Sequence, residues 1–96
     1  MKLSNLLASI EYTVINDGNP EITDIIYDSR KVTDGTAFVC LKGYTSDGHK
    51  YAQSAVEKGA AALIISDDLS FDVPKNVAVI KVENTRKALA RSEEHT

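Results

Sequence analysis

The sequence has a single cysteine and no long apolar stretch, and so lacks the features that disulfide-linked and membrane-spanning proteins require. Cys40 is the single cysteine among 96 residues, so no disulfide can form within the chain, which is typical of a reducing compartment. Cys40 lies in an apolar run, where we expect a small buried hydrophobic residue. No apolar stretch approaches the roughly 20 residues of a membrane helix, and the N-terminus lacks a signal-peptide core. A cytoplasmic location without a membrane partner is expected.

The motifs of self-sufficient catalysis are also missing. There is no phosphate-binding loop of the form G-x-x-x-x-G-K-[ST] and no G-x-G-x-x-G turn. No cysteine and histidine residues cluster at metal-ligand spacing, and His49 and His95 are far apart. The net charge of −3 argues against a broad nucleic-acid-binding surface. We therefore expect no catalytic residue, metal or cofactor in this chain and no nucleic-acid partner.

The hydrophobic pattern predicts an α/β fold. Apolar residues at helical spacing predict a short amphipathic helix from Leu3 to Ile10, and a turn-forming cluster follows at 16–20. Further along, strands alternate with helices, which favours a single small domain with a mixed or mostly parallel sheet and flanking helices. The remaining predicted elements are strands at 22–27, 36–41, 60–65 and 77–82, a helix at 47–58 followed by Gly59, and a helix starting near Thr85.

The C-terminal residues fit this pattern poorly. The last predicted helix has barely begun an apolar face when the chain reaches Arg91. We therefore predict a domain over residues 1–90 and a frayed or non-native tail over 91–96. The chain is expected to be a fragment of a longer protein.

Two polar loops follow predicted strands and could carry function. The first is Tyr27-Asp28-Ser29-Arg30, and the second is 43–49, which leads into a helix. Ligands of open α/β sheets bind outside the carboxyl ends of the strands, and a helix N-terminus offers unpaired N–H groups. The two loops could therefore form one side of a small-molecule pocket. The alternative is two simple turns, with Asp28 and Arg30 paired locally and Asp47 only capping a helix.

The individual side chains leave both interpretations open. The Ser29 hydroxyl can donate and accept a hydrogen bond, as recognition of a uracil edge requires, but serine is also common in turns. Tyr27 and Tyr44 could stack on a base or simply pack. Arg30 could hold a phosphate through two hydrogen bonds or form an ion pair with its neighbour. His49 could act as an acid or base, although a partly exposed packing residue is the simpler interpretation.

Taken together, these loops resemble the N-terminal domain of the Mur ligases of bacterial cell-wall synthesis. The resemblance extends to about Ala90. It is closer to the members that add the third peptide residue to UDP-N-acetylmuramoyl-L-Ala-D-Glu than to those that add D-Ala-D-Ala. The motifs are specific in combination, and they are Tyr27-Asp28-Ser29-Arg30-Lys31-Val32, Gly35, Phe38-Val39, Lys42-Gly43-Tyr44, Asp47-Gly48-His49, Ala55 and Gly59-Ala60.

The resemblance implies a role for each loop. Tyr27 and Ser29 would contact the uridine of UDP-N-acetylmuramoyl-dipeptide, and Tyr44, Thr45 and Ser46 would lie along the nucleotide. The residues that match the motif without contacting the ligand would shape the loops, and these are Asp28, Arg30, Asp47, Gly48 and His49.

The family's ATP chemistry has no counterpart in this chain. The G-T-N-G-K-T loop, the central ATPase domain with its magnesium ligands and the C-terminal domain that selects the amino acid are missing. The resemblance therefore implies a substrate-binding module, inactive alone, whose partners are the central and C-terminal domains of a parent that uses ATP and magnesium. The alternatives are the corresponding domain of the D-Ala-D-Ala-adding ligase and a standalone binding module. The choice between diaminopimelate and lysine lies outside this sequence.

Overall fold

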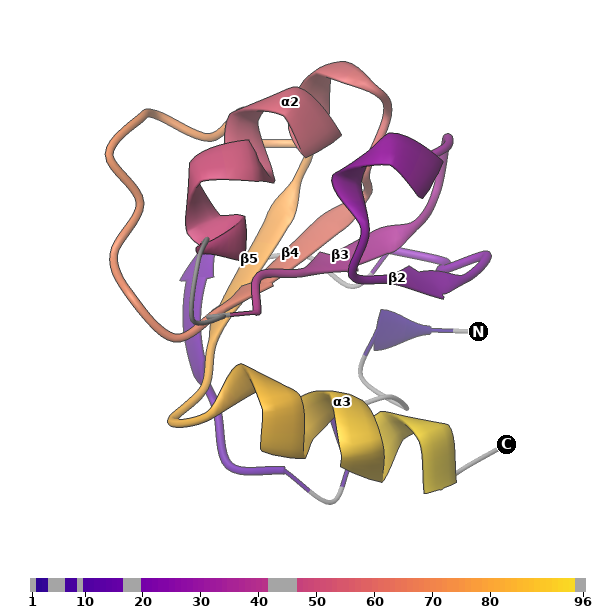
Figure 1. The fold of residues 1–96 in the computed structure, drawn as a ribbon, viewed down its shortest axis with the longest axis vertical. Coiled ribbons are helices and arrows are strands. Elements are labelled where there is room, and N and C mark those ends of the chain that lie inside the picture. Colours follow the sequence, from indigo (N-terminus) through magenta and orange to yellow (C-terminus); the bar gives the residue numbers. More distant parts are fainter. Residues whose placement is uncertain (1, 4–6, 9, 17–19, 42–46, 95–96) are drawn as a thin grey trace.

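The computed structural model describes residues 2–3, 7–8, 10–16, 20–41 and 47–94, with the side chains described as far as residue 90. Short strands, 3-10 helices and α-helices follow one another along the chain (Figure 1). In chain order they are β1 (Thr13–Asn16), β2 (Ile25–Ile26), η1 (Ser29–Lys31), β3 (Ala37–Val39), η2 (Gly48–Tyr51), α2 (Ala52–Glu57), β4 (Ala62–Ile65), β5 (Ala78–Lys81) and α3 (Thr85–Glu94).

The strands form one mixed sheet of five strands, in the order β1-β5-β4-β3-β2. Strands β2, β3, β4 and β5 run parallel to one another, with β2 at one edge of the sheet. Strand β1 forms the other edge and pairs antiparallel with β5. The pairing of β1 is irregular between Val14 and Asn16. The prediction of a small α/β domain with a mixed or mostly parallel sheet is confirmed.

Both faces of the sheet are covered, and the strand sequences show why. Successive side chains of a strand point to opposite faces, so Phe38 belongs to one core cluster and Val39 to the other. The cluster around Phe38 packs under α2 and the 66–77 connection, through Ala52, Ala55 and Phe71 among others. The other cluster includes Ala88 of α3 on the opposite face (Figure 1). Strands buried on both faces read as continuous apolar runs, as β3 and β4 do, and as β5 does up to Ile80.

The element boundaries differ from the predicted ones in identifiable places. Strand β2 is two residues long, and just before it the backbone N–H of Thr23 donates to the Gly35 carbonyl ahead of β3. The helix predicted from Asp47 begins as the 3-10 turn η2 and becomes α-helical only at Ala52. Strand β1 was not predicted. The helix predicted from Leu3 to Ile10 falls largely on residues that are not described; of the described ones, Leu3 and Leu7 are buried and residues 7–8 form a turn.

Helix α3 starts at Thr85 as predicted, and its backbone is helical as far as Glu94. The predicted tail at 91–96 therefore overlaps the end of a helix, and the nature of these residues stays a prediction. Within the described part of the chain, no helix combines the length and the apolar character needed to cross a membrane.

Candidate functional site

The first polar loop is held by Asp28, which lies in extended conformation just after β2. Its carboxylate accepts the backbone N–H of Arg30 at 3.0 Å and so caps the 3-10 turn η1. The same carboxylate accepts two hydrogen bonds from the guanidinium, from Nε at 3.0 Å and from a terminal nitrogen at 2.9 Å. These bonds hold the pKa of Asp28 at about 2, the side-chain bond from Arg30 contributing most and the backbone N–H of Arg30 next. Much of the donor capacity of Arg30 is therefore used within the loop.

Ser29 stands at the start of η1, half-buried. Its backbone carbonyl accepts a hydrogen bond of 2.8 Å from the Lys58 ammonium at the end of α2. Within the described part of the chain, its hydroxyl makes no hydrogen bond to another residue. Ser29 is thus fixed through its main chain, which leaves its side-chain hydroxyl available to a ligand.

The second polar loop is described only from Asp47 onward. Tyr44, Thr45 and Ser46, for which contacts along a nucleotide were predicted, lie outside the described residues. The Asp47 carboxylate accepts the backbone N–H of His49 at 3.0 Å and caps η2. Asp47 therefore performs the same capping function here as Asp28 performs in the first loop.

Gly48 approaches the end of strand β3 very closely. Its N–H donates to the Leu41 carbonyl at 2.7 Å. A Cβ at this position would lie 2.8 Å from the Leu41 nitrogen and 2.9 Å from the Leu41 oxygen, closer than real Cβ contacts allow. Both atoms belong to the backbone and cannot swing away, so this contact requires glycine.

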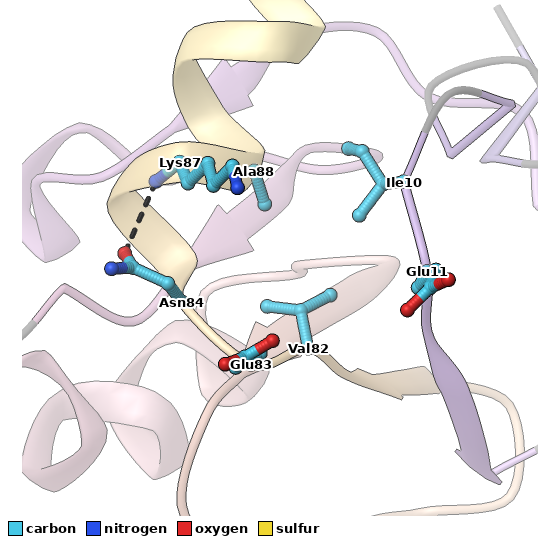
Figure 2. A pocket seen from close by; sticks show the side chains of 7 residues that line it. All are labelled: Ile10, Glu11, Val82, Glu83, Asn84, Lys87 and Ala88. Atoms are coloured by element: carbon cyan, nitrogen blue, oxygen red, sulfur yellow. Dashed lines mark hydrogen bonds between the residues drawn. The ribbon is translucent and has the colours of Figure 1, made fainter.

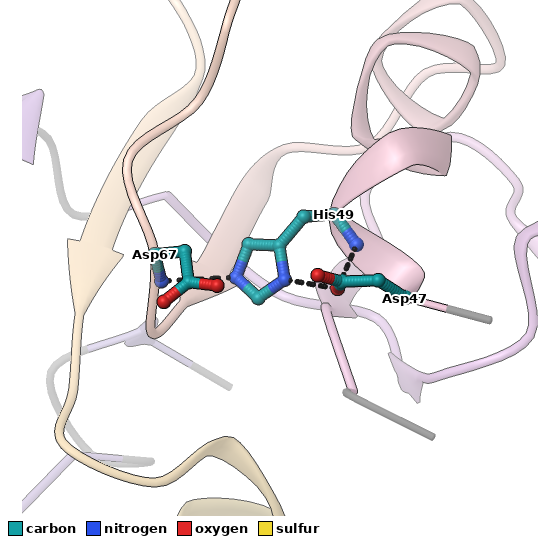
Figure 3. Close-up of side chains that lie close together, drawn as sticks. All are labelled: Asp47, His49 and Asp67. Atoms are coloured by element: carbon teal, nitrogen blue, oxygen red, sulfur yellow. Dashed lines mark hydrogen bonds and ion pairs between the residues drawn. The ribbon is translucent and has the colours of Figure 1, made fainter. Parts of the chain in front are cut away.

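The imidazole of His49 connects two segments at the carboxyl end of the sheet. One ring nitrogen, Nδ1, hydrogen-bonds to an oxygen of Asp47. The other, Nε2, accepts the backbone N–H of Ser66 at 3.0 Å, immediately after β4. It also accepts the backbone N–H of Asp67 at 3.1 Å (Figure 3). His49 is nearly buried, with 9% of its side chain exposed.

Asp47, His49 and Asp67 also form the one set of possible metal ligands among the described residues. Their ligand atoms all lie within 4.8 Å of one another (Figure 3). A metal-bound histidine must offer the lone pair of a ring nitrogen. In this arrangement Nε2 already accepts two N–H groups and Nδ1 faces a carboxylate, so His49 has no nitrogen left to offer. The cluster is therefore a hydrogen-bonded connection that does not suit a metal ion.

A pocket of about 580 Å³ joins the first polar loop with the end of the second. Predicted site residues Tyr27 and Ser29 line it, together with three of the predicted loop-shaping residues. Its other lining residues come from β3, from the segment just after it, from η2 and from α3. The complete lining is Tyr27, Asp28, Ser29, Arg30, Phe38, Leu41, Gly48, Tyr51 and Arg86.

Four of these lining residues were absent from the predicted site. Tyr51 is the last residue of η2, and 41% of it is exposed. Arg86 comes from α3, far away in the sequence. Nothing in its local sequence identifies it, because only the packing of α3 against the sheet brings it to this edge. Phe38 belongs to β3, and Leu41 follows two residues after the end of that strand.

A second pocket of about 360 Å³ lies on the α3 side of the sheet. Its floor is formed by the apolar side chains of Ile10, Val82 and Ala88 (Figure 2). The polar residues at its edge include Asn84, whose side chain accepts the backbone N–H of Lys87 at 3.2 Å and so caps α3. The remaining lining residues are Glu11, Glu83 and Lys87. No residue of the predicted site lines this pocket.

Comparison with known proteins finds one family profile and close relatives that all belong to the Mur ligases. The profile of the "Mur ligase family, catalytic domain" matches residues 21–94. The chain is 46% identical over 91 residues to UDP-N-acetylmuramoyl-L-alanyl-D-glutamate–2,6-diaminopimelate ligase of Clostridium botulinum, covering 94% of the chain and 19% of that relative. The ligase of the same name from Clostridioides difficile is 45% identical over 92 residues, or 95% of the chain and 18% of that protein.

Solved structures show the same domain. MurF from Acinetobacter baumannii superposes with a TM-score of 0.78 at 28% identity, over 92% of this chain and 19% of that chain. MurF from Thermotoga maritima, solved in complex with ADP, superposes with a TM-score of 0.64 at 26% identity, over 75% of this chain and 16% of that one. The chain thus spans about a fifth of the length of the relatives that it matches. It belongs to the Mur ligase family, and its five-stranded sheet with flanking helices corresponds to the N-terminal domain of these ligases.

Proposed function

We propose that this domain binds the uridine diphosphate part of UDP-N-acetylmuramoyl-L-Ala-D-Glu for a ligase that adds the third peptide residue. The observation that carries the proposal is the pocket at the carboxyl ends of β2 and β3. It brings Tyr27 and Ser29 together with Gly48, the anchor of the second loop. Open α/β sheets bind ligands at this edge.

The pocket residues offer the groups that a uridine nucleotide needs. Tyr27 is 59% exposed, so its ring can cover the face of a base. The Ser29 hydroxyl can donate to a uracil carbonyl or accept from the ring N–H. Arg30 and Arg86 both line the pocket, and a guanidinium group suits the diphosphate; that of Arg30 also binds Asp28. Tyr44, Thr45 and Ser46 remain part of the proposed site on the strength of the sequence resemblance.

The proposed parent is an ATP-dependent ligase of peptidoglycan precursor synthesis. The ADP complex of the Thermotoga maritima relative supports the use of ATP. The partners of the domain would be the substrate and the central and C-terminal domains of the same parent, with magnesium serving the ATP. The names of the relatives favour diaminopimelate as the added residue. We place this ligase in the cytoplasm, in keeping with the single buried cysteine.

The D-Ala-D-Ala-adding ligase is the less favoured parent. The relatives that carry the diaminopimelate ligase name are 45–46% identical to this chain. The compared structures of MurF, the ligase that adds D-Ala-D-Ala, are 26–28% identical to this chain, although their fold is the same. The sequence identities therefore favour the diaminopimelate ligase as the parent, whereas the fold is common to both ligases.

Titration of the isotopically labelled chain with UDP-N-acetylmuramoyl-L-Ala-D-Glu, followed by NMR, tests the proposal. We expect amide shifts at 27–30, at 48–51 and at Arg86, and weaker binding by Ser29→Ala. The matched control is Ser70→Ala, because Ser70 is an exposed serine outside the pocket. Shifts confined to other regions, or equal affinities of the two serine variants, would contradict the assignment.

A further inference from the structure

The hydrogen bonds of His49 define which of its ring nitrogens carries the proton. Two backbone N–H groups point at Nε2, from Ser66 at 3.0 Å and from Asp67 at 3.1 Å. A proton on Nε2 would face both donors, so Nε2 must be the bare, accepting nitrogen. The proton of the neutral ring then lies on Nδ1 and is donated to the Asp47 carboxylate. Both nitrogens are satisfied in this single arrangement.

The same arrangement joins parts of the chain that are separate in sequence. Asp47 precedes η2, whereas Ser66 and Asp67 follow strand β4, so the imidazole links the start of η2 to the turn after the central strand (Figure 3). Gly48, the first residue of η2, lies between Asp47 and His49 in the sequence. Its N–H in turn donates to Leu41, and both Gly48 and Leu41 line the pocket.

We propose that His49 is a positioning residue for the nucleotide pocket. By anchoring η2 to the turn after β4, it keeps Gly48 against Leu41 and so sets the position of this wall of the pocket. Since both nitrogens are engaged within the protein, His49 acts through hydrogen bonding and neither moves a proton nor touches the ligand. Its consequence for binding rests on the proposed function, whereas the link itself does not.

A histidine that merely fills space would behave differently from one that accepts two N–H groups. His49→Gln supplies a carbonyl oxygen that can reach the position of Nε2, whereas His49→Phe supplies a ring of similar shape without an acceptor. If the role is packing, the Phe variant matches the wild type best. If the role is acceptance of the two N–H groups, the Gln variant does, because buried N–H groups left without a partner are costly.

The control variant is Asp67→Asn. It neutralises a carboxylate of the cluster but keeps the backbone N–H that donates to His49. We expect this variant to keep the ring proton on Nδ1 and to bind uridine diphosphate as the wild type does. A metal site built on the three side chains would instead be weakened by this change and would respond to EDTA.

The test uses the full chain in three measurements. The first is the nitrogen NMR spectrum of the His49 ring, in which we expect Nε2 to be unprotonated. The second is hydrogen exchange of the Ser66 and Asp67 amides, which we expect to be about tenfold faster in His49→Phe than in His49→Gln. The third is titration with uridine diphosphate, in which the Kd of the Phe variant should rise about tenfold and that of the Gln variant less than about threefold.

The outcomes separate the two proposals. A proton on Nε2, EDTA-sensitive ring signals, or equal amide exchange in the Phe and Gln variants would overturn the role of His49. If the wild type fails to bind uridine diphosphate while the ring and exchange results hold, the proposed function falls and the anchoring role of His49 stands. Should the Phe variant not fold, the comparison of the Gln variant with the wild type still decides the matter through the exchange of the two amides.

Discussion

Replacement of Gly48 by alanine is expected to destabilise the domain, even though its backbone conformation is one that alanine adopts readily. Glycines with positive φ in the described residues are Gly35 and Gly59, so Gly48→Ala carries no backbone strain of that kind. The effect must come from the added Cβ, which would lie 2.8 and 2.9 Å from the backbone nitrogen and oxygen of Leu41. Because no side chain can move aside, η2 must withdraw from the end of β3.

The magnitude follows from two contributions. Withdrawal breaks the 2.7 Å hydrogen bond from Gly48 to Leu41, which contributes about 1 kcal/mol. Forcing an extra carbon into a packed contact costs about 1–3 kcal/mol more. We therefore expect the free energy of unfolding to fall by about 2–4 kcal/mol out of a total of about 5–15 kcal/mol, so most of the protein stays folded.

Urea unfolding followed by circular dichroism measures this loss. With a slope of about 2 kcal/mol per molar urea, the midpoint should fall by about 1–2 M. The control is Gln53→Ala at an exposed position of α2, where we expect a change within about 0.5 kcal/mol. If Gly48→Ala is no more destabilising than Gln53→Ala, the close contact with Leu41 does not exist in solution and the geometry of the pocket wall is wrong.

Three further predictions concern other parts of the fold. Gly59→Ala should lower stability by at least about 1–2 kcal/mol in urea unfolding, because Gly59 has a φ of 104° and its Cβ would meet Asp34; an unchanged midpoint would contradict this. Arg30 lowers the pKa of Asp28 from 3.8 to about 2, so the ionised Asp28 contributes fully to the free energy of unfolding above pH 3.8, and this contribution is lost as the pH falls through 2. The difference in free energy of unfolding between wild type and Asp28→Asn should therefore shrink over that pH range. A difference that stays constant would refute the ion pair. Burial is the main cause that raises the pKa of the Cys40 thiol to about 12, and the nearby Asp47 carboxylate is the second cause. Iodoacetamide at neutral pH should therefore modify Cys40 far more slowly in the native chain than in the urea-unfolded chain. Similar rates would show that Cys40 is accessible in the native chain.

The interior strands of the sheet could be predicted because their signal is local. Apolar runs over 36–41, 60–65 and 77–82 correspond to β3, β4 and β5, each shortened by two or three residues. Strand β1 was missed although Thr13, Val14 and Ile15 are β-branched, since the prediction gave weight to the turn cluster that follows. Three of its four residues are exposed, so β1 lacks the continuous burial of the interior strands. It is a strand because it pairs with β5, a contact that is distant in the sequence.

The site was predictable only to the extent that it is contiguous in sequence. The loop around Ser29 follows β2 directly, and its capping by Asp28 is a local pattern of side chain and spacing. The remaining pocket residues depend on tertiary packing. Arg86 reaches the pocket from the last helix, and the acceptor role of His49 depends on backbone N–H groups of the turn after β4, which no side-chain motif can reveal.

The pairing of β1 has a consequence for the order in which the domain folds. Thr13 pairs with Lys81, so the first strand made during synthesis finds its partner only when nearly the whole described chain has emerged. The parallel strands β2 to β5 each lie beside the next strand in sequence and can assemble progressively. Long-range pairings form slowly because the intervening chain must first be ordered. Until β5 is in place, the exposed apolar residues Val14 and Ile15 belong to an unpaired strand, so we expect the β1 segment to be open to misassembly.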